Sequence, residues 1–144
     1  MAGERSHRDL VVWQKAVDLS VLVYEAARQL PPEERFGLWS QLTRAAASVP
    51  MNIAEGRGRQ GPREFANFLS IARGSLAELD TALEICVRLG YFARHDMAAI
   101  EALADEVGRM LTTLALRLRE SRARGLPPIA YRWCRRWESN PHGC

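Results

Sequence analysis

The amino-acid sequence predicts an all-α protein, an antiparallel up-down-up-down bundle of four helices. Three observations support this prediction. Apolar residues recur at steps of three and four along four long stretches, which is the period of a helix with one buried face. Prolines and glycines separate these stretches, and no segment of useful length alternates apolar and polar residues as a half-buried strand does. Helices of similar length joined by short connections pack most simply as antiparallel neighbours.

The first two helices are bounded by prolines. The first is expected at about residues 9–30, where two consecutive prolines end it. The second is expected at about residues 37–55, with Pro50 inside it. Proline removes an amide donor and clashes with the carbonyl four residues earlier, so we expect a kink near residues 46–50.

The third and fourth helices have the most regular patterns and are expected at about residues 62–89 and 96–121. The expected core positions of the third are Phe65, Leu69, Ala72, Leu76, Leu79, Leu83 and Cys86. Those of the fourth include Ile100, Leu103, Val107, Leu111, Leu114 and Leu118. Such patterns are typical of the inner seam of a bundle. Gly74 and Ser75 in the third helix favour a close crossing with a neighbour.

The chain divides into an N-terminal segment at residues 1–8, the bundle at residues 9–121 and an irregular basic tail at residues 122–144. The tail contains arginines interleaved with Tyr131, Trp133 and Trp137. Aromatic side chains can stack on bases while arginines contact phosphates, so the tail could bind single-stranded nucleic acid. The alternative is that the tail is an extension without structure.

The net charge of +3 of the whole chain arises from the excess of arginine in the tail. Residues 1–120 carry 15 basic and 16 acidic side chains, whereas residues 121–144 carry five arginines and one glutamate. Overall basicity therefore gives no argument that the bundle binds nucleic acid.

Several classes of protein are excluded by composition. The three cysteines form no C-x-x-C pair, which argues against a disulfide framework and a zinc knuckle. The first residues are polar rather than a signal peptide, and no apolar run is long enough to span a membrane, so we expect a cytoplasmic protein. The three histidines have no triad setting, and no Glu-x-x-His spacing occurs on facing helices of the predicted bundle. We expect no catalytic residue, no metal and no cofactor.

Residues 56–61 match the G-x-G-x-x-G fingerprint of dinucleotide-binding proteins. A helix rather than a strand is expected before them, and there is no parallel sheet to form the binding crevice. A second interpretation concerns Arg57, Arg59 and Arg63, which cluster where a helix begins and where free amides favour an anion. These residues could hold a phosphate or an RNA backbone. The alternative is a glycine-rich turn with solvated arginines.

Asn52 and Glu55 have the spacing of a capping box. Asn52 would restart the helix after Pro50, and Glu55 would return a hydrogen bond. The alternative is that both side chains face a partner subunit.

Several longer motifs occur together in one order. They are DLVVWQKA at residues 9–16, RFGL at 35–38, SQL at 40–42, SVP at 48–50, NIAEG at 52–56, LGY at 89–91 and EVGRML at 106–111. Short pairs at residues 64–65, 74–75 and 78–79 fall between them. With these motifs, residues 9–120 resemble the four-helix-bundle proteins encoded in intervening sequences of bacterial 23S rRNA genes.

The resemblance implies a non-enzymatic protein that assembles into a ring-like homopentamer and binds structured RNA. The family is also similar to the accessory variability determinants of diversity-generating retroelements, pentamers that bind nucleic acid and a reverse transcriptase. This kinship strengthens the anion-site interpretation of Arg57, Arg59 and Arg63, and it adds Arg44, which stands at a basic position of the family. The family generally ends near the fourth helix, so the resemblance assigns no function to residues 122–144.

Two residues depart from the family pattern in an informative way. Met51 and Trp39 stand where small or polar residues are common, which suggests a surface that is buried on oligomerisation. The alternative function is therefore a protein-interaction module, or an accessory subunit of a nucleic-acid-processing enzyme, without direct nucleic-acid contact.

Overall fold

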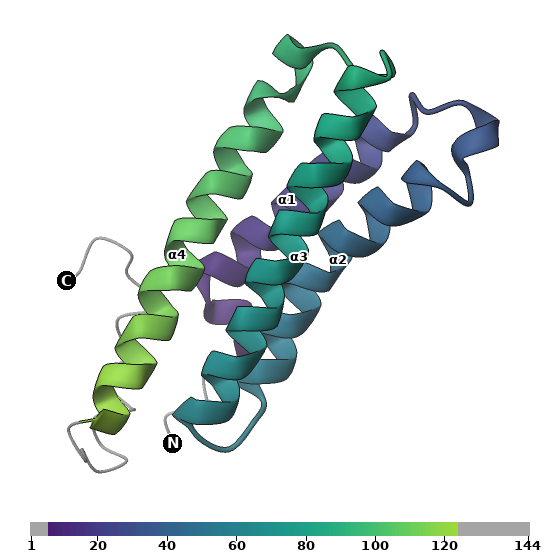
Figure 1. The fold of residues 1–144 in the computed structure, drawn as a ribbon. Coiled ribbons are helices and arrows are strands. Elements are labelled where there is room, and N and C mark those ends of the chain that lie inside the picture. The colour runs from purple at the N-terminus through teal and green to yellow at the C-terminus, as the bar shows by residue number, and fades with distance from the viewer. Residues whose placement is uncertain (1–5, 124–144) are drawn as a thin grey trace.

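The computed structural model describes residues 6–123, with side chains up to residue 120. This part of the chain is all-α, as predicted, and its helices form an antiparallel bundle (Figure 1). The four α-helices are α1 (Val11–Ala27), α2 (Leu38–Arg57), α3 (Pro62–Arg88) and α4 (Ala98–Ala123). Three short 3-10 turns precede α1, α2 and α4, namely η1 (His7–Asp9), η2 (Pro32–Glu34) and η3 (Arg94–Met97). The tail predicted at residues 122–144 lies outside the described residues from residue 124 onward.

The connections between helices contain the residues that end one helix and begin the next. Gly90 has φ of 83°, and the amide of Tyr91 donates to the carbonyl of Cys86 at 2.9 Å, which closes α3 as a Schellman motif. Gly61 has φ of 115° directly before Pro62, the first residue of α3. The first helix is shorter than expected because residues 7–9 form η1 and residues 28–30 form a turn.

The core runs the length of the bundle as two adjoining clusters of buried side chains. One cluster includes Leu10, Ile53, Phe65, Leu69, Leu111 and Leu118. The other includes Leu19, Val23, Leu42, Leu79, Leu83 and Cys86. The predicted core positions of α3 are confirmed except for Leu76, which is only half-buried and lies beside the groove between α3 and α4.

Helices α2 and α3 are in close contact at Gly56. A Cβ atom there would lie 2.7 Å from Cβ of Phe68 and 2.9 Å from Cδ2 of Phe65, so glycine is required for this contact. The close crossing predicted at Gly74 and Ser75 is found at Ser75, whose Oγ lies 2.8 Å from Ser48 Oγ on α2, and not at Gly74. Gly74 is exposed, and a Cβ atom there would have no neighbour within 4 Å among the described residues.

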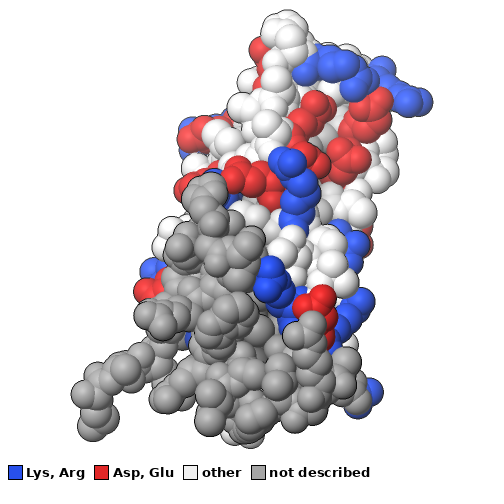
Figure 2. All heavy atoms as spheres, turned by 90° about the vertical axis from the view of Figure 1, so that its left-hand side faces the viewer, with Lys and Arg blue, Asp and Glu red and all other residues white. Residues whose placement is uncertain are grey.

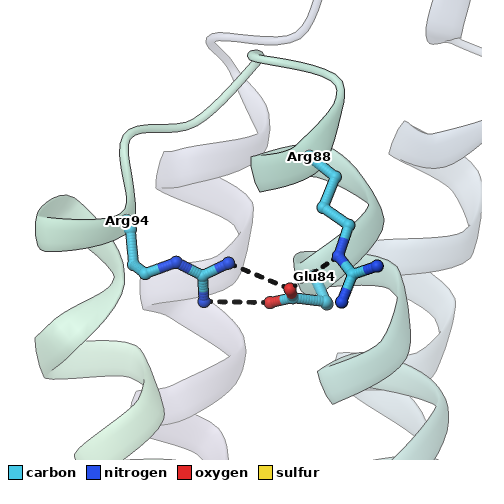
Figure 3. A network of polar contacts seen from close by, with 3 residues as sticks. All are labelled: Glu84, Arg88 and Arg94. Atoms are coloured by element: carbon cyan, nitrogen blue, oxygen red, sulfur yellow. Dashed lines mark hydrogen bonds and ion pairs between the residues drawn. The ribbon is translucent and has the colours of Figure 1, made fainter.

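An ion-pair network fastens the α3–α4 connection at its exposed surface (Figure 3). The carboxylate of Glu84 accepts hydrogen bonds from Nη1 and Nη2 of Arg94 at 3.0 and 2.9 Å and from Nε of Arg88 at 3.0 Å. These bonds lower the pKa of Glu84 from 4.5 to about 2, the Arg94 bonds contributing most. The network therefore joins the last turns of α3 to η3.

Candidate nucleic-acid interface

The antiparallel topology brings the arginines of the α2–α3 turn to one end of the bundle. The N-terminus of α1, the C-terminus of α2, the N-terminus of α3 and the C-terminus of α4 meet there, at the bottom of Figure 1. Leu10, Ile53, Phe65 and Leu118 belong to one buried cluster and hold these four termini together. We call this region the arginine end and define it by Arg8, Arg57, Arg59, Arg63, Arg117 and Arg119.

Three of these six arginines were predicted as site residues. Arg59 donates to Oε1 of Glu55 at 2.6 Å, and its guanidinium lies 5.1 Å from the ring centroid of Phe68. Arg57 is half-buried, and Arg63 is exposed in the first turn of α3. Arg59 is therefore held in place by Glu55 and Phe68, whereas Arg63 is open to solvent.

The other three arginines were missed at the level of the sequence. The guanidinium of Arg8 in η1 lies 5.5 Å from the ring of Trp13, Arg117 on α4 is half-buried, and Arg119 is exposed. Arg117 and Arg119 are 54 or more residues away from Arg63 in sequence, and only the antiparallel packing of α3 and α4 brings them to the same end. The apolar stripe ending at Leu118, combined with the predicted topology, was the signal that could have located them.

Arg44 does not join this group. It lies on α2, 13 residues before Arg57, which is about 20 Å along the helix axis. Its exposed side chain lines a hollow of about 570 Å³ over the outer face of α2, together with Tyr24, Ser48, Met51, Asn52 and Glu78. The structure thus separates Arg44 from the other predicted site residues.

Charge is distributed unequally between the two ends. The arginine end carries the six arginines and four acidic residues, Asp9, Glu55, Glu64 and Glu120. The opposite end, which we call the acidic end, carries Glu25, Glu33, Glu34, Glu84, Asp96 and Glu101 with only Arg28, Arg35, Arg88 and Arg94. Between the ends, acidic and basic side chains are interleaved over the uncovered part of the α4 face (Figure 2). The charge asymmetry therefore lies along the bundle axis.

The predicted capping role of Asn52 is wrong. Helix α2 continues through Pro50, so no helix starts at Asn52. The side-chain amide of Asn52 instead donates to the carbonyl and the hydroxyl of Ser48 at 2.8 and 2.9 Å, and Ser48 Oγ lies 2.8 Å from Ser75 Oγ on α3. Glu55 pairs with Arg59. Among these contacts, the Ser48–Ser75 pair joins α2 to α3.

The glycine fingerprint at residues 56–61 has a packing explanation. Helix α2, not a strand, precedes it, and at Gly56 the α2 backbone lies against Phe65 and Phe68 of α3, where a Cβ atom would not fit. Within residues 6–120, no group of three or more histidine, cysteine, aspartate or glutamate side chains is arranged to hold a metal ion. Burial raises the pKa of the Cys86 thiol to about 11, so this cysteine is a protonated core residue at neutral pH. None of the helices described is both long and apolar enough to cross a membrane.

Comparisons with known proteins agree with the resemblance in the sequence motifs. A family model described as 23S rRNA-intervening sequence protein matches residues 8–113. A similar solved structure is the crystal structure of a protein of unknown function from the S23 ribosomal protein family of Bacteroides thetaiotaomicron. It is 26% identical, with a TM-score of 0.68, and the match covers 73% of this chain and 98% of that one. No curated protein matches the chain.

Proposed function

Because the chain belongs to the 23S rRNA-intervening sequence protein family, we propose that it is a non-enzymatic, self-associating protein that binds structured RNA through its arginine end. One observation supports the location of the site above all. Six arginines from η1, α2, the α2–α3 turn, α3 and α4 meet at one end of the bundle, while the opposite end is acidic.

The chemistry of these side chains suits a phosphate backbone. A guanidinium group stays charged at all physiological pH values and can donate two parallel hydrogen bonds to one phosphate. The first-turn amides of α3, next to Arg63, lack helical acceptors and favour an anion further. Recognition through the backbone reads the shape of a folded RNA rather than its base sequence.

The acidic end helps to orient the protein relative to an approaching RNA. Like charges repel, so a polyanion approaches the arginine end and is excluded from the acidic one. We therefore expect end-on binding, with the bundle axis pointing away from the RNA surface.

Two pairs of substitutions test this proposal at equal net charge. Arg63→Ala with Arg119→Ala removes two exposed arginines from the arginine end, and Arg28→Ala with Arg35→Ala removes two from the acidic end. Binding of the full chain to a fluorescent RNA hairpin is measured over a salt series. The first pair is expected to lower affinity at least ten-fold and to reduce the salt slope by about 2, since two phosphate contacts are lost. The second pair should bind like the wild type.

The tail requires its own control, because residues 122–144 carry five arginines. Replacing Arg132, Arg135 and Arg136 with alanine in the full chain separates its charge from that of the bundle. Equal losses from the Arg63/Arg119 and Arg28/Arg35 pairs, or a loss from the tail variant alone, would reject the arginine end as the site.

A second candidate function is a protein-interaction module without RNA contact. It is favoured by two apolar side chains, Met51 at 68% and Phe36 at 90% exposure. Trp39 supports it less, because its ring packs edge-on against Tyr24 with centroids 6.2 Å apart. Apolar docking persists at high salt whereas phosphate binding weakens, so the same salt series separates the two functions.

A further inference from the structure

Helices α3 and α4 leave a groove of about 680 Å³ along the outside of the bundle. Its floor consists of small or apolar side chains, among them Leu76, Ala77, Leu79, Ala104 and Gly108. A Cβ atom at Gly108 would have only Leu76 Cδ1, at 3.7 Å, within 4 Å outside its own helix. A peptide segment that lies in the groove can therefore approach the α4 backbone closely.

The charged residues of this groove are sorted along the bundle axis. Arg73 and Arg109 lie toward the arginine end, and Asp80, Glu101 and Asp105 lie toward the acidic end. Arg109 pairs with Asp105 at 3.2 Å. Within the described chain, Asp80 and Glu101 take part in no hydrogen bond or ion pair. The acidic half of the groove therefore offers two carboxylates to a cationic segment.

The part of the sequence that follows α4 has the complementary order of charge. Helix α4 ends with Ala123 at the arginine end, so the rest of the chain starts at the same end as the basic half of the groove. Residues 125–131 contain no charged side chain, whereas residues 132–136 contain three arginines. Trp133 and Trp137 stand among these arginines. An uncharged stretch is thus followed by a basic and aromatic one.

The length of this segment matches the length of the groove. Gly125, Pro127 and Pro128 are residues that favour a reversal of the chain. The eight residues 129–136 then span about 26 Å when extended. Asp105 lies 18 residues before Ala123 on α4, which is about 27 Å along the helix axis. A segment that runs back along α4 therefore reaches the acidic half of the groove with its arginines.

We propose that residues 129–137 dock into the α3–α4 groove of their own chain and run antiparallel to α4. The uncharged residues 129–131 pass over the basic half of the groove, and the arginines of residues 132–136 lie beside Asp80 and Glu101. Trp133 and Trp137 cover the apolar floor and lose contact with water. Each charged part of the segment then faces the opposite sign.

The covalent connection makes such a contact effective. Ion pairs at an exposed surface are individually weak, but a short flexible linker gives the tethered segment an effective concentration of about millimolar. The hollow over α2 suits the segment less well, because its charged residues are Arg44 and Glu78, which cancel. The groove between α3 and α4 is therefore the surface that fits this segment.

Docking of this segment goes beyond the proposed function and does not depend on RNA. Its test is intramolecular cross-linking of the full chain at low protein concentration in the absence of RNA. Cys134 lies within the proposed segment and reacts with maleimides, whereas Cys86 is buried, with a pKa raised to about 11. Cys144→Ser removes the other cysteine of the tail.

A second cysteine is then placed in the groove with Ala77→Cys or, as a matched control, in the hollow over α2 with Ala47→Cys. The two positions lie at similar levels along the bundle, because Ser48 contacts Ser75. A short bismaleimide links the pair, and mass spectrometry follows the product within one chain. After normalisation to the rate with a monofunctional maleimide, the link to Ala77→Cys should form at least ten-fold faster.

Charge reversal shows whether the groove attracts the segment. In the Ala77→Cys protein, Arg135→Glu with Arg136→Glu should slow the link at least ten-fold. Adding Asp80→Arg with Glu101→Arg reverses both sides of the contact and should restore the rate. Adding Asp18→Arg with Glu25→Arg instead changes two exposed carboxylates of α1 outside the groove and should not restore it.

A fast link within one chain that is lost on reversal of the arginines and recovered by the groove variant alone supports the docking. Equal normalised rates at Ala77→Cys and Ala47→Cys would overturn it. So would an unchanged rate after reversal of the arginines, equal recovery by the groove and α1 variants, or links that form between chains rather than within one.

Discussion

The hydroxyl of Ser20 on α1 lies 2.8 Å from the carbonyl oxygen of Ala46 on α2, to which it donates a hydrogen bond. Ala46 stands four residues before Pro50, which has no amide hydrogen, so this carbonyl lacks its donor within the helix. The side chain of a neighbouring helix supplies the missing hydrogen bond. Pro50 is therefore accommodated inside α2, and whether it also bends the helix axis stays a prediction.

Replacing Ser20 with alanine should show that its hydroxyl takes the place of the amide that Pro50 lacks. The carbonyl of Ala46, a fully buried residue, would lose its partner, at a cost of about 1–2 kcal/mol in the free energy of unfolding. In a Pro50→Ala background the new amide of residue 50 can donate to the carbonyl of Ala46. Ser20→Ala should then lower the free energy of unfolding by less. Urea denaturation of the four proteins of this double-mutant cycle measures the difference. Equal costs in both backgrounds would mean that Ser20 stabilises the protein in another way.

Gly56 and Gly74 should respond oppositely to alanine. At Gly56 the new Cβ would collide with Phe65 and Phe68, and we expect a loss of about 1–3 kcal/mol. At Gly74 the new Cβ has open space in a helix interior, where alanine is favoured by about 0.5–1 kcal/mol. Thermal unfolding of the two variants tests this, with a lower Tm expected for the first and an equal or higher Tm for the second.

Leu79 lies in the buried core of α3 and is 0% exposed. Leu79→Ala should destabilise the protein by about 2–5 kcal/mol, because it removes buried methyl groups and leaves a cavity. Leu89→Ala, ten residues later at a 58% exposed position, is the control and should change stability little. A cost below about 0.5 kcal/mol at Leu79 would contradict its central position in the core.

Acid should weaken the Glu84 network. In the folded protein the hydrogen bonds from Arg94, followed by those from Arg88, hold the pKa of Glu84 at about 2, below its ordinary value of 4.5. The stabilisation is therefore fully present above about pH 4.5 and is lost as the pH falls toward 2. Denaturation of the wild type and of Glu84→Gln from about pH 6 to pH 3 should show a gap in unfolding free energy that narrows with acid.

The control for this pH dependence is Glu25→Gln, which removes an exposed carboxylate that forms no ion pair within the described chain. Its gap from the wild type should not narrow in the same way. Added salt should reduce the Glu84 effect, since the network is at the surface and is screened. A gap that stays constant with pH would show that Arg88 and Arg94 do not stabilise the carboxylate.

The fold and most of its core were predictable from local pattern. Steps of three and four place Phe65, Leu69 and Leu79 on one side of α3 whatever packs against them, because the helical period depends only on backbone geometry. Prolines and glycines locate the ends of helices for equally local reasons, as Gly61 and Gly90 show. The same reasoning found the arginines of the α2–α3 turn.

What the pattern left open depends on contacts between distant segments. The capping spacing at Asn52 was misleading because Ser20 supplies the hydrogen bond that Pro50 removes, so α2 has no break to cap. Arg119 lies at the same end of the bundle as Arg63 because α3 and α4 are antiparallel. Arg44 lies far from that end because α2 is a long continuous helix. The sequence by itself determined which residues form helices and which face the core, since both follow from local backbone geometry. The tertiary structure alone decided which charges share an end or a groove, because those distances are set by packing between helices far apart in the chain.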